Sequence, residues 1–391
     1  MDKLIFHIDV NSAYLSWSAV EKLKNGSDMD LREIPSIVGG DIASRHGIVL
    51  AKSIPAKAYG IKTGEPVSHA LKKCPILISE PPNHKLYSRY SHELMELLVT
   101  FCPNIEQVSV DECYMDFTDY IPSYASPVAA ATQIKDTVYD TFGFTVNVGI
   151  SCNKLLAKMA SDFQKPNRVH TLFPEEIATK MWPLPVGELY MVGKSSANAL
   201  KKLEISTIGD LANTDVNILV SHMKSHGQLI WEYANGIDDT PVVTEETESK
   251  CVGNSTTLPR DAETAQEAKK ILLSLANQVA GRLKKHGQLA GMVSTELKYA
   301  SFVKVSHQKQ LSSATCDGKE IYTAACQLFD ELWNGEAIRL LGIRTSKLTQ
   351  EAEPVQMSLF DLPKTQKEIK ADSAMEALKK KFGDDVIKKG W

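Results

Sequence analysis

The sequence lacks the features typical of membrane, secreted, zinc-binding and disulfide-rich proteins. No apolar run approaches the roughly 20 residues needed to cross a bilayer, and the N-terminus lacks the basic-then-apolar order of a signal peptide. The 7 cysteines are scattered, without a Cys-x-x-Cys pair, so neither a zinc site nor a disulfide framework is indicated. We therefore expect a cytoplasmic protein with no membrane partner, in a reducing compartment.

Composition and length indicate a globular protein of more than one domain. The chain has 391 residues, 43% of them hydrophobic and 24% charged, and a chain of this length divides into about two to four domains. Its net charge of −4 is unevenly spread, because residues 251–350 contain 13 Lys and Arg against 9 Asp and Glu. A locally basic segment fits nucleic-acid binding, although many solvated surfaces have the same balance.

Two adjacent acids, Asp111 and Glu112, divide a run of β-forming residues at 105–118. Apolar residues fall on even positions up to Val110 and on odd positions from Cys113 onward. A single strand keeps its parity, so the change of phase predicts two antiparallel strands joined by a two-residue turn at the acids, with Val110 opposite Cys113. The turn lacks the Asn or Gly that a tight hairpin favours.

Two interpretations of the acidic pair remain open from this segment alone. Asp is common in turns, so the pair fits a solvated loop. Two carboxylates at a hairpin tip also fit a site that needs their charge. A third acid, Asp9, lies near the end of the apolar run at 4–10, which predicts a buried strand. An acid there is out of place unless it is paired or holds a cation.

The first 173 residues alternate between expected strands and helices. Helices are expected at about 12–24, 67–73, 85–101, 128–142 and 151–161, and strands at 4–10, 37–38, 48–50 and 145–150. A loop of small residues occupies 39–47. This is an α+β layer pattern in which Asp9 and the pair at 111–112 could meet.

Short helices are expected from 174 to about 233. Within them, residues 191–211 resemble a helix–hairpin–helix, a module that presents backbone N–H groups to phosphate. Its candidate DNA-binding residues are Gly193, Lys194 and Ser195. Such hairpins usually have Gly-x-Gly, and Met191 stands in the first glycine position.

After a linker at about 241–250, a strand–helix–strand–strand–helix–strand order predicts a split α/β sandwich at 251–350. Strands are expected at 253–258, 292–299, 304–311 and 338–348, and helices at 262–285 and 317–333. Alternation places a polar set on one rim of its sheet: Ser255, Thr257, Thr295, Lys304, Ser306, Arg344 and Ser346. Beyond 350 the chain is polar except for Gln356-Met-Ser-Leu-Phe360.

Six ordered motifs resemble the Y-family DNA polymerases, the translesion enzymes, over residues 1–350. They are Asp9–Tyr14, Ala51–Ile61, Ser109–Asp116, Val148–Lys158, Lys165–Asn167 and Leu340–Ser346. The resemblance implies an α+β, multidomain right-hand polymerase. Its parts are a palm (1–12 and 84–173), fingers (13–83), a helical thumb (174–240), a linker (241–250), a split α/β little finger (251–350) and a flexible tail (351–391).

By this resemblance, the protein is a low-fidelity, template-directed DNA polymerase that adds deoxynucleotides to a primer 3′ end and copies damaged template. Asp9, Asp111 and Glu112 are the implied catalytic acids, and they hold two Mg²⁺ ions together with the main-chain carbonyl of Val10. Mg²⁺ prefers oxygen ligands and few carboxylates, which fits this set. Three acids gathered without cations are costly, which favours a metal site over a set of salt bridges.

The resemblance also implies the nucleotide contacts. Lys57 and Lys165 fall on triphosphate-binding positions, Tyr14 on the steric gate that excludes a 2′-OH, and Ala51 on the open roof over the nascent pair. The family often has Arg where this chain has Lys57, and Tyr where it has Ile54. Lysine lacks the bidentate fork of arginine, so the grip on the triphosphate is looser or differently shared.

The remaining implied partners are primer–template DNA and a bacterial sliding clamp. Ser255, Thr257, Lys304 and Arg344 join the 193–195 hairpin as candidate DNA contacts, and Gln356, Ser358, Leu359 and Phe360 form the candidate clamp-binding peptide. A monomer is expected. The subfamily stays open between polymerase IV and polymerase V. A silent DNA-binding relative and another palm-type enzyme, such as a nucleotidyl cyclase, are the alternatives; the complete acid set disfavours the first and the DNA-binding segments disfavour the second.

Overall fold

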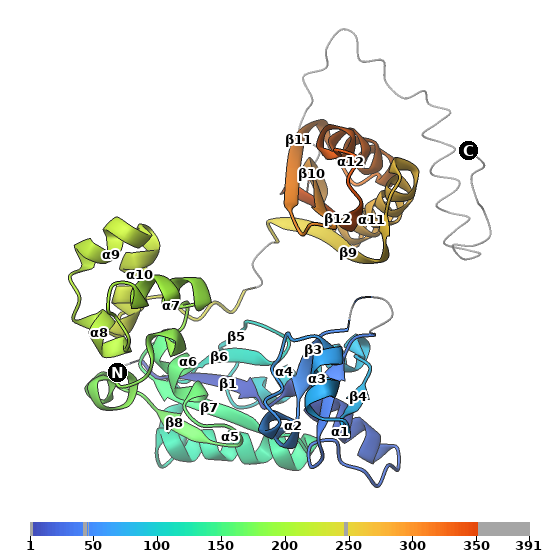
Figure 1. The fold of residues 1–391 in the computed structure, drawn as a ribbon. Coiled ribbons are helices and arrows are strands. Elements are labelled where there is room, and N and C mark those ends of the chain that lie inside the picture. The colour runs from blue at the N-terminus through green and yellow to red at the C-terminus, as the bar shows by residue number, and fades with distance from the viewer. Residues whose placement is uncertain (1–2, 42–44, 46, 246–248, 351–391) are drawn as a thin grey trace. The chain divides into compact units, whose positions relative to one another are not determined.

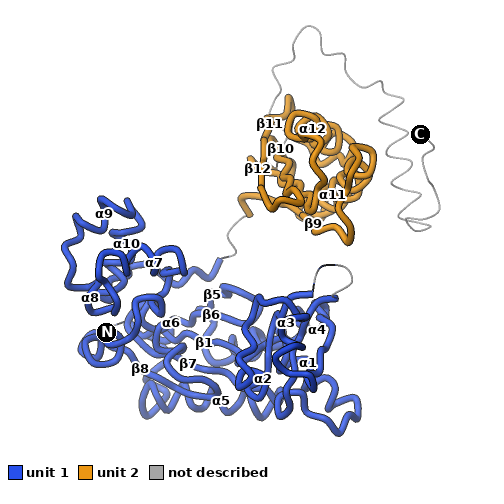
Figure 2. Tube along the Cα trace, in the orientation of Figure 1, with its two compact units in different colours: residues 1–248 blue, residues 249–391 orange. Residues whose placement is uncertain are grey.

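The computed structural model describes residues 3–41, 45, 47–245 and 249–350. Contacts divide the chain into two units, 1–248 and 249–391 (Figures 1 and 2). Among the described residues, no helix combines the length and the apolar character that a membrane span requires.

Unit 1 is built on a five-stranded sheet with the order β5-β6-β1-β7-β8. Its strands are β1 Ile5–Val10, β5 Ile105–Gln107, β6 Glu112–Asp116, β7 Val146–Ser151 and β8 Val169–Thr171. Helices α4 His84–Val99 and α5 Pro127–Phe142 pack on one face, and α6 Lys154–Asp162 packs on the other (Figure 1). Alternation along β1 therefore sends Phe6 and Ile8 into the main core and turns His7 and Asp9 toward α6.

The approach of α6 to the sheet depends on Gly149 in β7. A Cβ placed there would lie 2.0 Å from the carbonyl oxygen of Ala157 and 2.5 Å from the backbone nitrogen of Ser161. Any other residue would push α6 outward, because real Cβ atoms do not approach backbone so closely. Because Gly149 allows this close packing, Lys158 and Ser161 of α6 reach the side chains of Asp9 and His7 in β1.

A smaller sheet, with the order β3-β2-β4, lies beside α1 Ala13–Lys24. It consists of β2 Ser36–Gly39, β3 Val49–Lys52 and β4 Ile78–Glu80, with helices α2 Ile54–Ala58 and α3 Val67–Lys73. Val38 and Ala51 belong to the same buried cluster as Phe6 and Ile8, so the two sheets share one core. Sequence analysis had not anticipated α2, β4 or β8, each of which is only 3 to 5 residues long.

The rest of unit 1 is helical. It contains α7 Lys194–Lys201, α8 Ile208–Ala212, α9 Val216–Met223 and α10 Ser225–Ala234, with one-turn helices at Pro174–Glu176, Ile177–Met181 and Val186–Glu188. Its core includes Leu156 and Met159 of α6, so this part is anchored to the main sheet. A further one-turn helix, Ile121–Ser123, packs instead on the core of the main sheet.

The first residues of the expected linker are hydrogen-bonded to the rest of unit 1. The backbone nitrogen of Val243 donates to Glu106, whose carboxylate also accepts from the ammonium of Lys154 at 2.7 Å. The Leu155 N–H donates to Asp238, just ahead of this segment. Residues 238–243 are therefore tied to β5 and to the start of α6.

Unit 2 is an antiparallel sheet of four strands, ordered β11-β10-β12-β9, with two helices on one face. The strands are β9 Cys251–Ala262, β10 Leu289–Tyr299, β11 Lys304–Thr315 and β12 Ile338–Thr349, and the helices are α11 Ala265–Lys285 and α12 Gly318–Leu332. The expected order of elements is the observed one, with strands longer than predicted.

Thr295 is a correction to the predicted polar rim. It is fully buried, and its hydroxyl donates to the carbonyl of Ala325 in α12, so it faces the helices. Register pairs Ser294 with Arg344 and Ser255 with Gly342, which places Arg344 and Ser255 on the opposite face, the uncovered face, on which no helix of the described residues of unit 2 packs. Lys304 lies on that face too, paired with Glu296 at 2.7 Å.

The predicted two-residue turn at Asp111 and Glu112 is wrong. Strand β5 pairs Ile105 with Met115 and Gln107 with Cys113, so the connection spans 108–111 and Glu112 is already the first residue of β6. Val110, expected to face Cys113, is 36% exposed in that connection. The change of apolar phase came from a four-residue loop with an exposed valine, not from a tight turn.

Candidate active site

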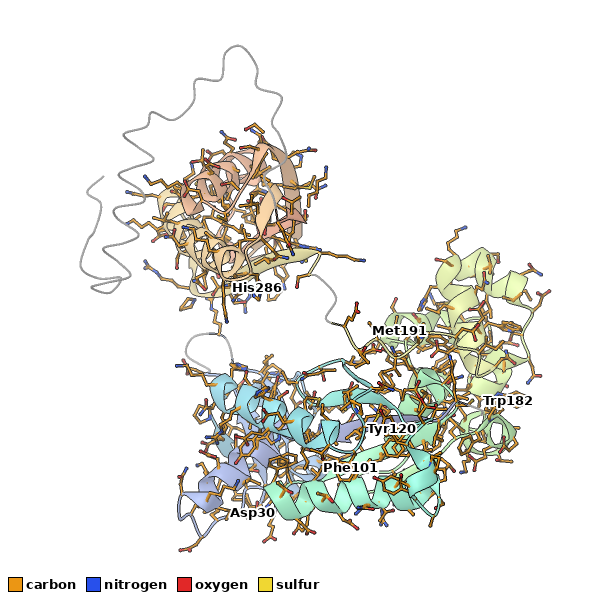
Figure 3. All side chains as sticks on the ribbon, turned by 180° about the vertical axis from the view of Figure 1, so that it is seen from behind. Asp30, Phe101, Tyr120, Trp182, Met191 and His286 are labelled. Carbon is orange, nitrogen blue, oxygen red and sulfur yellow. The ribbon has the colours of Figure 1, made fainter. Side chains whose placement is uncertain are left out.

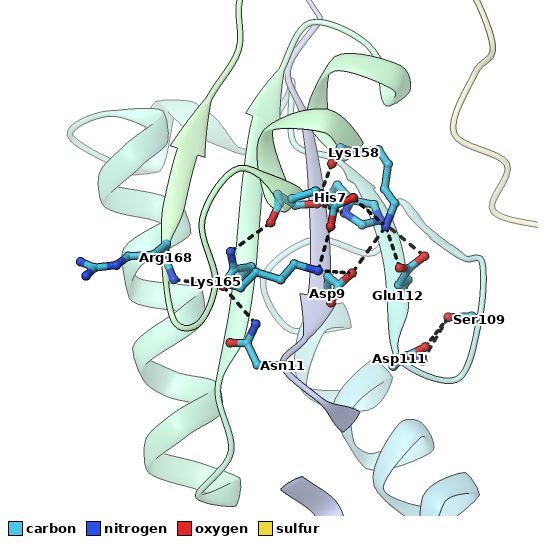
Figure 4. Close-up of polar contacts among 12 residues, drawn as sticks. His7, Asp9, Asn11, Ser109, Asp111, Glu112, Lys158, Lys165 and Arg168 are labelled. Carbon is cyan, nitrogen blue, oxygen red and sulfur yellow. Dashed lines mark hydrogen bonds and ion pairs between the residues drawn. The ribbon is translucent and has the colours of Figure 1, made fainter. Parts of the chain in front are cut away.

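Strand register brings two of the three candidate acids together. Asp9 in β1 pairs with Glu112 in β6 on one side and with Asn147 in β7 on the other. Neighbouring residues in register project to the same face, so both carboxylates point toward α6 (Figure 4). Asp9 is buried, whereas the Glu112 side chain is 26% exposed.

Two lysines hold these carboxylates. The Lys158 ammonium lies 2.6 Å from Glu112 Oε1 and 3.5 Å from Asp9 Oδ2, bridging the pair. The Lys165 ammonium lies 3.0 Å from Asp9 Oδ2 and 2.8 Å from Asp162 Oδ1. Each buried negative charge is therefore paired, as a carboxylate in a low-dielectric site requires.

The third acid, Asp111, approaches through its backbone. Its carbonyl accepts from the Val10 N–H at 3.0 Å, which places it at the end of β1. Its carboxylate instead accepts from the Ser109 hydroxyl at 2.6 Å, turned away from Asp9 and Glu112 (Figure 4). Within the described residues, no three His, Cys, Asp or Glu side chains are arranged to hold a metal ion.

The donor set nevertheless suits a hard divalent cation. Asp9 and Glu112 offer carboxylate oxygens from adjacent strands, and Asp111 and the Val10 carbonyl lie at the same strand end. Oxygen donors with few carboxylates are what Mg²⁺ takes in proteins. Lys158 already occupies the space between Asp9 and Glu112 as a monovalent cation, so a cation in that place is compatible with the fold.

Burial dominates the electrostatics of Asp9 and His7. Desolvation raises the pKa of Asp9 to about 6, although the charge of Lys165 acts in the opposite direction. Burial, reinforced by the charge of Lys158, lowers the pKa of His7 well below its usual value. Lys158 and Lys165 remain cationic, because their carboxylate partners outweigh desolvation and raise the pKa of each.

His7 is held as one neutral tautomer. The Ser161 hydroxyl donates to the carbonyl of Lys158, so its oxygen accepts from His7 Nδ1 at 2.8 Å. His7 Nε2 then presents a lone pair toward Glu112 Oε2, 3.9 Å away, and forms no hydrogen bond with any described residue. Neither His7 nor Lys158 was predicted as a site residue from the sequence, although Lys158 closes the Val148–Lys158 motif and lies four residues before Asp162 on α6.

Beside the acids lies a cavity of about 600 Å³. Its wall is formed mainly by β1, α1, β3 and α2, and it includes all the nucleotide-binding candidates of the sequence: Tyr14, Ala51, Lys57 and Lys165, with Asp9, Val10 and Asp111. The ring of Tyr14 is stacked on Tyr87 with centroids 4.4 Å apart and an interplanar angle of 9°. Stacking fixes the plane of the Tyr14 ring at the cavity wall.

The DNA-binding candidates occupy two surfaces. Gly193 caps α7, which begins at Lys194, so residues 193–195 form the start of that helix. Met191, labelled in Figure 3, is half exposed and has a φ of 69°, a conformation that glycine adopts more readily. The other candidates, Ser255, Thr257, Lys304 and Arg344, belong to unit 2. The candidate clamp residues, Gln356, Ser358, Leu359 and Phe360, lie outside the described residues.

Comparisons with known proteins agree with this architecture. The model of the impB/mucB/samB family matches residues 8–162, and the model of that family's C-terminal domain matches residues 249–359. DNA polymerase IV of Clostridium acetobutylicum is 48% identical over 387 residues, covering 99% of this chain and 97% of that protein. DNA polymerase IV 1 of Bacillus subtilis is 36% identical over 390 residues, covering 99% and 92%.

A solved structure shares the fold. A Y-family DNA polymerase chimera superposes with a TM-score of 0.77 over 89% of this chain and 100% of that one, at 21% identity. The two family models and the near full-length relatives together settle the membership. The chain belongs to the impB/mucB/samB family, the family of the Y-family DNA polymerases.

Proposed function

We propose that the chain extends a primer 3′ end with deoxynucleotides at the site formed by Asp9, Asp111 and Glu112, using two Mg²⁺ ions. As a Y-family member it is a DNA-directed DNA polymerase of the translesion type. The observation that carries the proposal is the pairing of Asp9 with Glu112 beside a cavity lined by Lys57 and Lys165. Acids for metal and cations for phosphate share one cavity.

The chain's own residues divide the work. Asp9, Glu112, Asp111 and the Val10 carbonyl would hold the ions, and the chemistry those ions supply is activation of the primer oxygen and charge neutralisation on the leaving pyrophosphate. For the ions to enter, Lys158 must release the two carboxylates and Asp111 must turn from Ser109. Lys165 stays positioned by Asp162.

The cavity wall selects the nucleotide. Tyr14, whose ring is stacked on Tyr87 at the cavity wall, would exclude a 2′-OH from beneath the sugar, and the small side chain of Ala51 would leave room beside the base. Lys57 and Lys165 meet the triphosphate as point charges. A small side chain at Ala51 is consistent with tolerance of damaged template bases.

The wider assignments are part of the same proposal. Residues 1–12 and 84–173 form the palm, 13–83 the fingers, 174–240 the thumb, 241–250 the linker and 251–350 the little finger. Primer–template DNA contacts the α7 start and the uncovered face of the unit 2 sheet. Residues 356–360 bind a bacterial sliding clamp, and the protein works as a cytoplasmic monomer.

Primer extension by Asp9→Asn and Glu112→Gln variants tests the metal site. Because each change removes charge that the reaction requires, we expect kcat to fall by roughly two to three orders of magnitude. DNA affinity, measured by fluorescence anisotropy, should stay near wild type. Asp119→Asn, at an exposed acid of the same segment, serves as the matched control. Normal extension by either site variant would refute the assignment, and DNA binding without extension by the wild type would indicate a silent relative.

Two further variants test recruitment and DNA contact. Replacing Leu359 and Phe360 by Ala should abolish stimulation by the clamp while basal extension is unchanged. Arg344→Ala should weaken DNA binding and reduce its salt dependence. A loss of basal extension in the first variant would instead indicate a role in folding.

A further inference from the structure

One lysine of the cavity wall lies in the Ala51–Ile61 motif but has no role assigned to it among the nucleotide contacts. Lys52 is the last residue of β3, is partly buried, and lines the cavity with Lys57 and Lys165. Its ammonium donates to the Thr63 hydroxyl at 3.1 Å. An ammonium has three donors, so with respect to the described residues this hydrogen bond leaves two for a group in the cavity.

The surroundings of Lys52 do not neutralise it. Burial lowers the pKa of Lys52, and the positive charge of Lys57 lowers it further. The carboxylate of Glu65 acts in the opposite direction but is the weakest of the three effects, and it forms its own ion pair with Lys73. The fold therefore keeps the partly buried ammonium of Lys52 within the electrostatic influence of the exposed Lys57, an arrangement that an anion would relieve.

The other lysine of the cavity is already engaged. Lys165 is paired with Asp9 and Asp162. Within residues 3–41, 45, 47–245 and 249–350, by contrast, no carboxylate forms an ion pair with Lys52 or Lys57. Of the acids of the cavity, Asp9 comes from β1 and Asp111 from the loop between β5 and β6. Lys52 and Lys57 come instead from the smaller sheet and the helix after it. One wall thus carries carboxylates and another carries uncompensated cations.

We propose that Lys52 binds the triphosphate of the incoming nucleotide together with Lys57. This inference rests on the proposed polymerase function and adds a residue to its nucleotide site. A lysine is a point charge without the two-pronged geometry of a guanidinium, so two lysines on one wall supply two separate contacts along a polyphosphate. The hydrogen bond from the Lys52 ammonium to the Thr63 hydroxyl orients the lysine side chain for this contact.

Nucleotide binding without chemistry gives the direct test. The full-length protein, bound to a primer–template with a dideoxy-terminated primer, is titrated with the complementary dNTP in Mg²⁺. Removing a charge-assisted contact should weaken dNTP binding by roughly 10- to 100-fold in Lys52→Ala, and Lys52→Arg should stay within about threefold of wild type. Lys62→Ala, at an exposed neighbour outside the cavity, makes the same charge change and should bind normally.

Two further measurements separate phosphate contact from a structural role. With an ordinary primer, Lys52→Ala should raise KM for dNTP while kcat changes little. Inorganic tripolyphosphate, which has only the phosphate chain, should inhibit the variant less than wild type by the same factor as the loss in dNTP affinity. The melting temperature of the variant should equal that of wild type.

The outcomes distinguish this inference from the function on which it depends. Normal dNTP affinity in Lys52→Ala, with a defect in Lys57→Ala, would overturn the role of Lys52 and leave the polymerase site intact. A fall in kcat and melting temperature without a change in tripolyphosphate inhibition would assign Lys52 to the fold alone. Failure of the wild type to extend primers would instead reject the proposed function.

Discussion

Replacing Lys158 by methionine tests whether an internal cation stands in the place of metal. The Lys158 side chain is 11% exposed and bridges Glu112 at 2.6 Å and Asp9 at 3.5 Å. Methionine keeps the apolar stem and removes the ammonium. In the variant, Asp9 keeps its ion pair with Lys165, whereas Glu112 loses its ion pair with a lysine.

The magnitude follows from the burial of the pair. Removing one partner of a buried ion pair costs about 3–5 kcal/mol, and we expect about 3 kcal/mol because Glu112 stays partly solvated and Asp9 keeps Lys165. For a unit of this size, that loss lowers the melting temperature by roughly 6–12 °C. The loss should appear in EDTA and shrink to less than half in saturating Mg²⁺, because a divalent cation then supplies the missing charge.

Calorimetric melting in EDTA and in Mg²⁺ measures the effect. Because Mg²⁺ no longer displaces an ammonium, the variant should also bind Mg²⁺ about tenfold more tightly, a gain of about 1.4 kcal/mol. Lys180→Met is the matched control, since the Lys180 side chain is 40% exposed against 11% for Lys158 and its i,i+4 pair with Glu176 contributes less than about 1 kcal/mol. An equal melting loss in both buffers, with unchanged Mg²⁺ affinity, would refute the exchange of lysine for metal.

Three other changes have defined outcomes. Tyr14→Ala removes the ring at the cavity wall and should reduce discrimination against ribonucleotides by about 10- to 100-fold in paired dNTP and rNTP kinetics; unchanged discrimination would make Tyr14 a packing residue only. Met191→Gly should raise stability by about 1 kcal/mol in urea melts, because glycine adopts the positive φ without strain, and a loss would contradict this. The Arg32 guanidinium holds the pKa of Asp30 below its usual 3.8, so this pair contributes stability at neutral pH that is lost as pH falls through the lowered pKa. Asp30→Asn should therefore be less stable than wild type at pH 7 and equal to it in strong acid; a pH-independent difference would exclude the ion pair as its cause.

Local patterns predicted the elements that bury a regular face. The helix at 85–101 and the strand at 4–10 were placed within one or two residues of α4 and β1, because apolar spacing there reflects packing against one core. Elements of 3 to 5 residues, such as β4 and β8, carry too few positions for any period to appear.

The site itself needed information that no local pattern contains. The alternation around Asp111 and Glu112 cannot distinguish a tight turn from a four-residue loop, because exposed Val110 looks like a strand residue in sequence. The role of Lys158 depends on how close α6 comes to the sheet, which Gly149 determines from a strand earlier in the chain. Only the assembled sheet shows that a lysine, and not solvent, faces Asp9.

The opposing charges of the cavity are held apart by packing rather than by loops. Val38 and Ala51 of the smaller sheet share a buried cluster with Phe6 and Ile8 of the larger one, so the wall that carries Lys52 is rigidly joined to the wall that carries Asp9. A nucleotide that contacts both walls therefore meets a preformed site and orders little of the chain on binding. For this reason, losses of affinity on replacing a cavity lysine report mainly on its own contact with phosphate. A loss of nucleotide affinity accompanied by a lower melting temperature would instead indicate that the substitution disturbs the buried cluster shared by the two sheets.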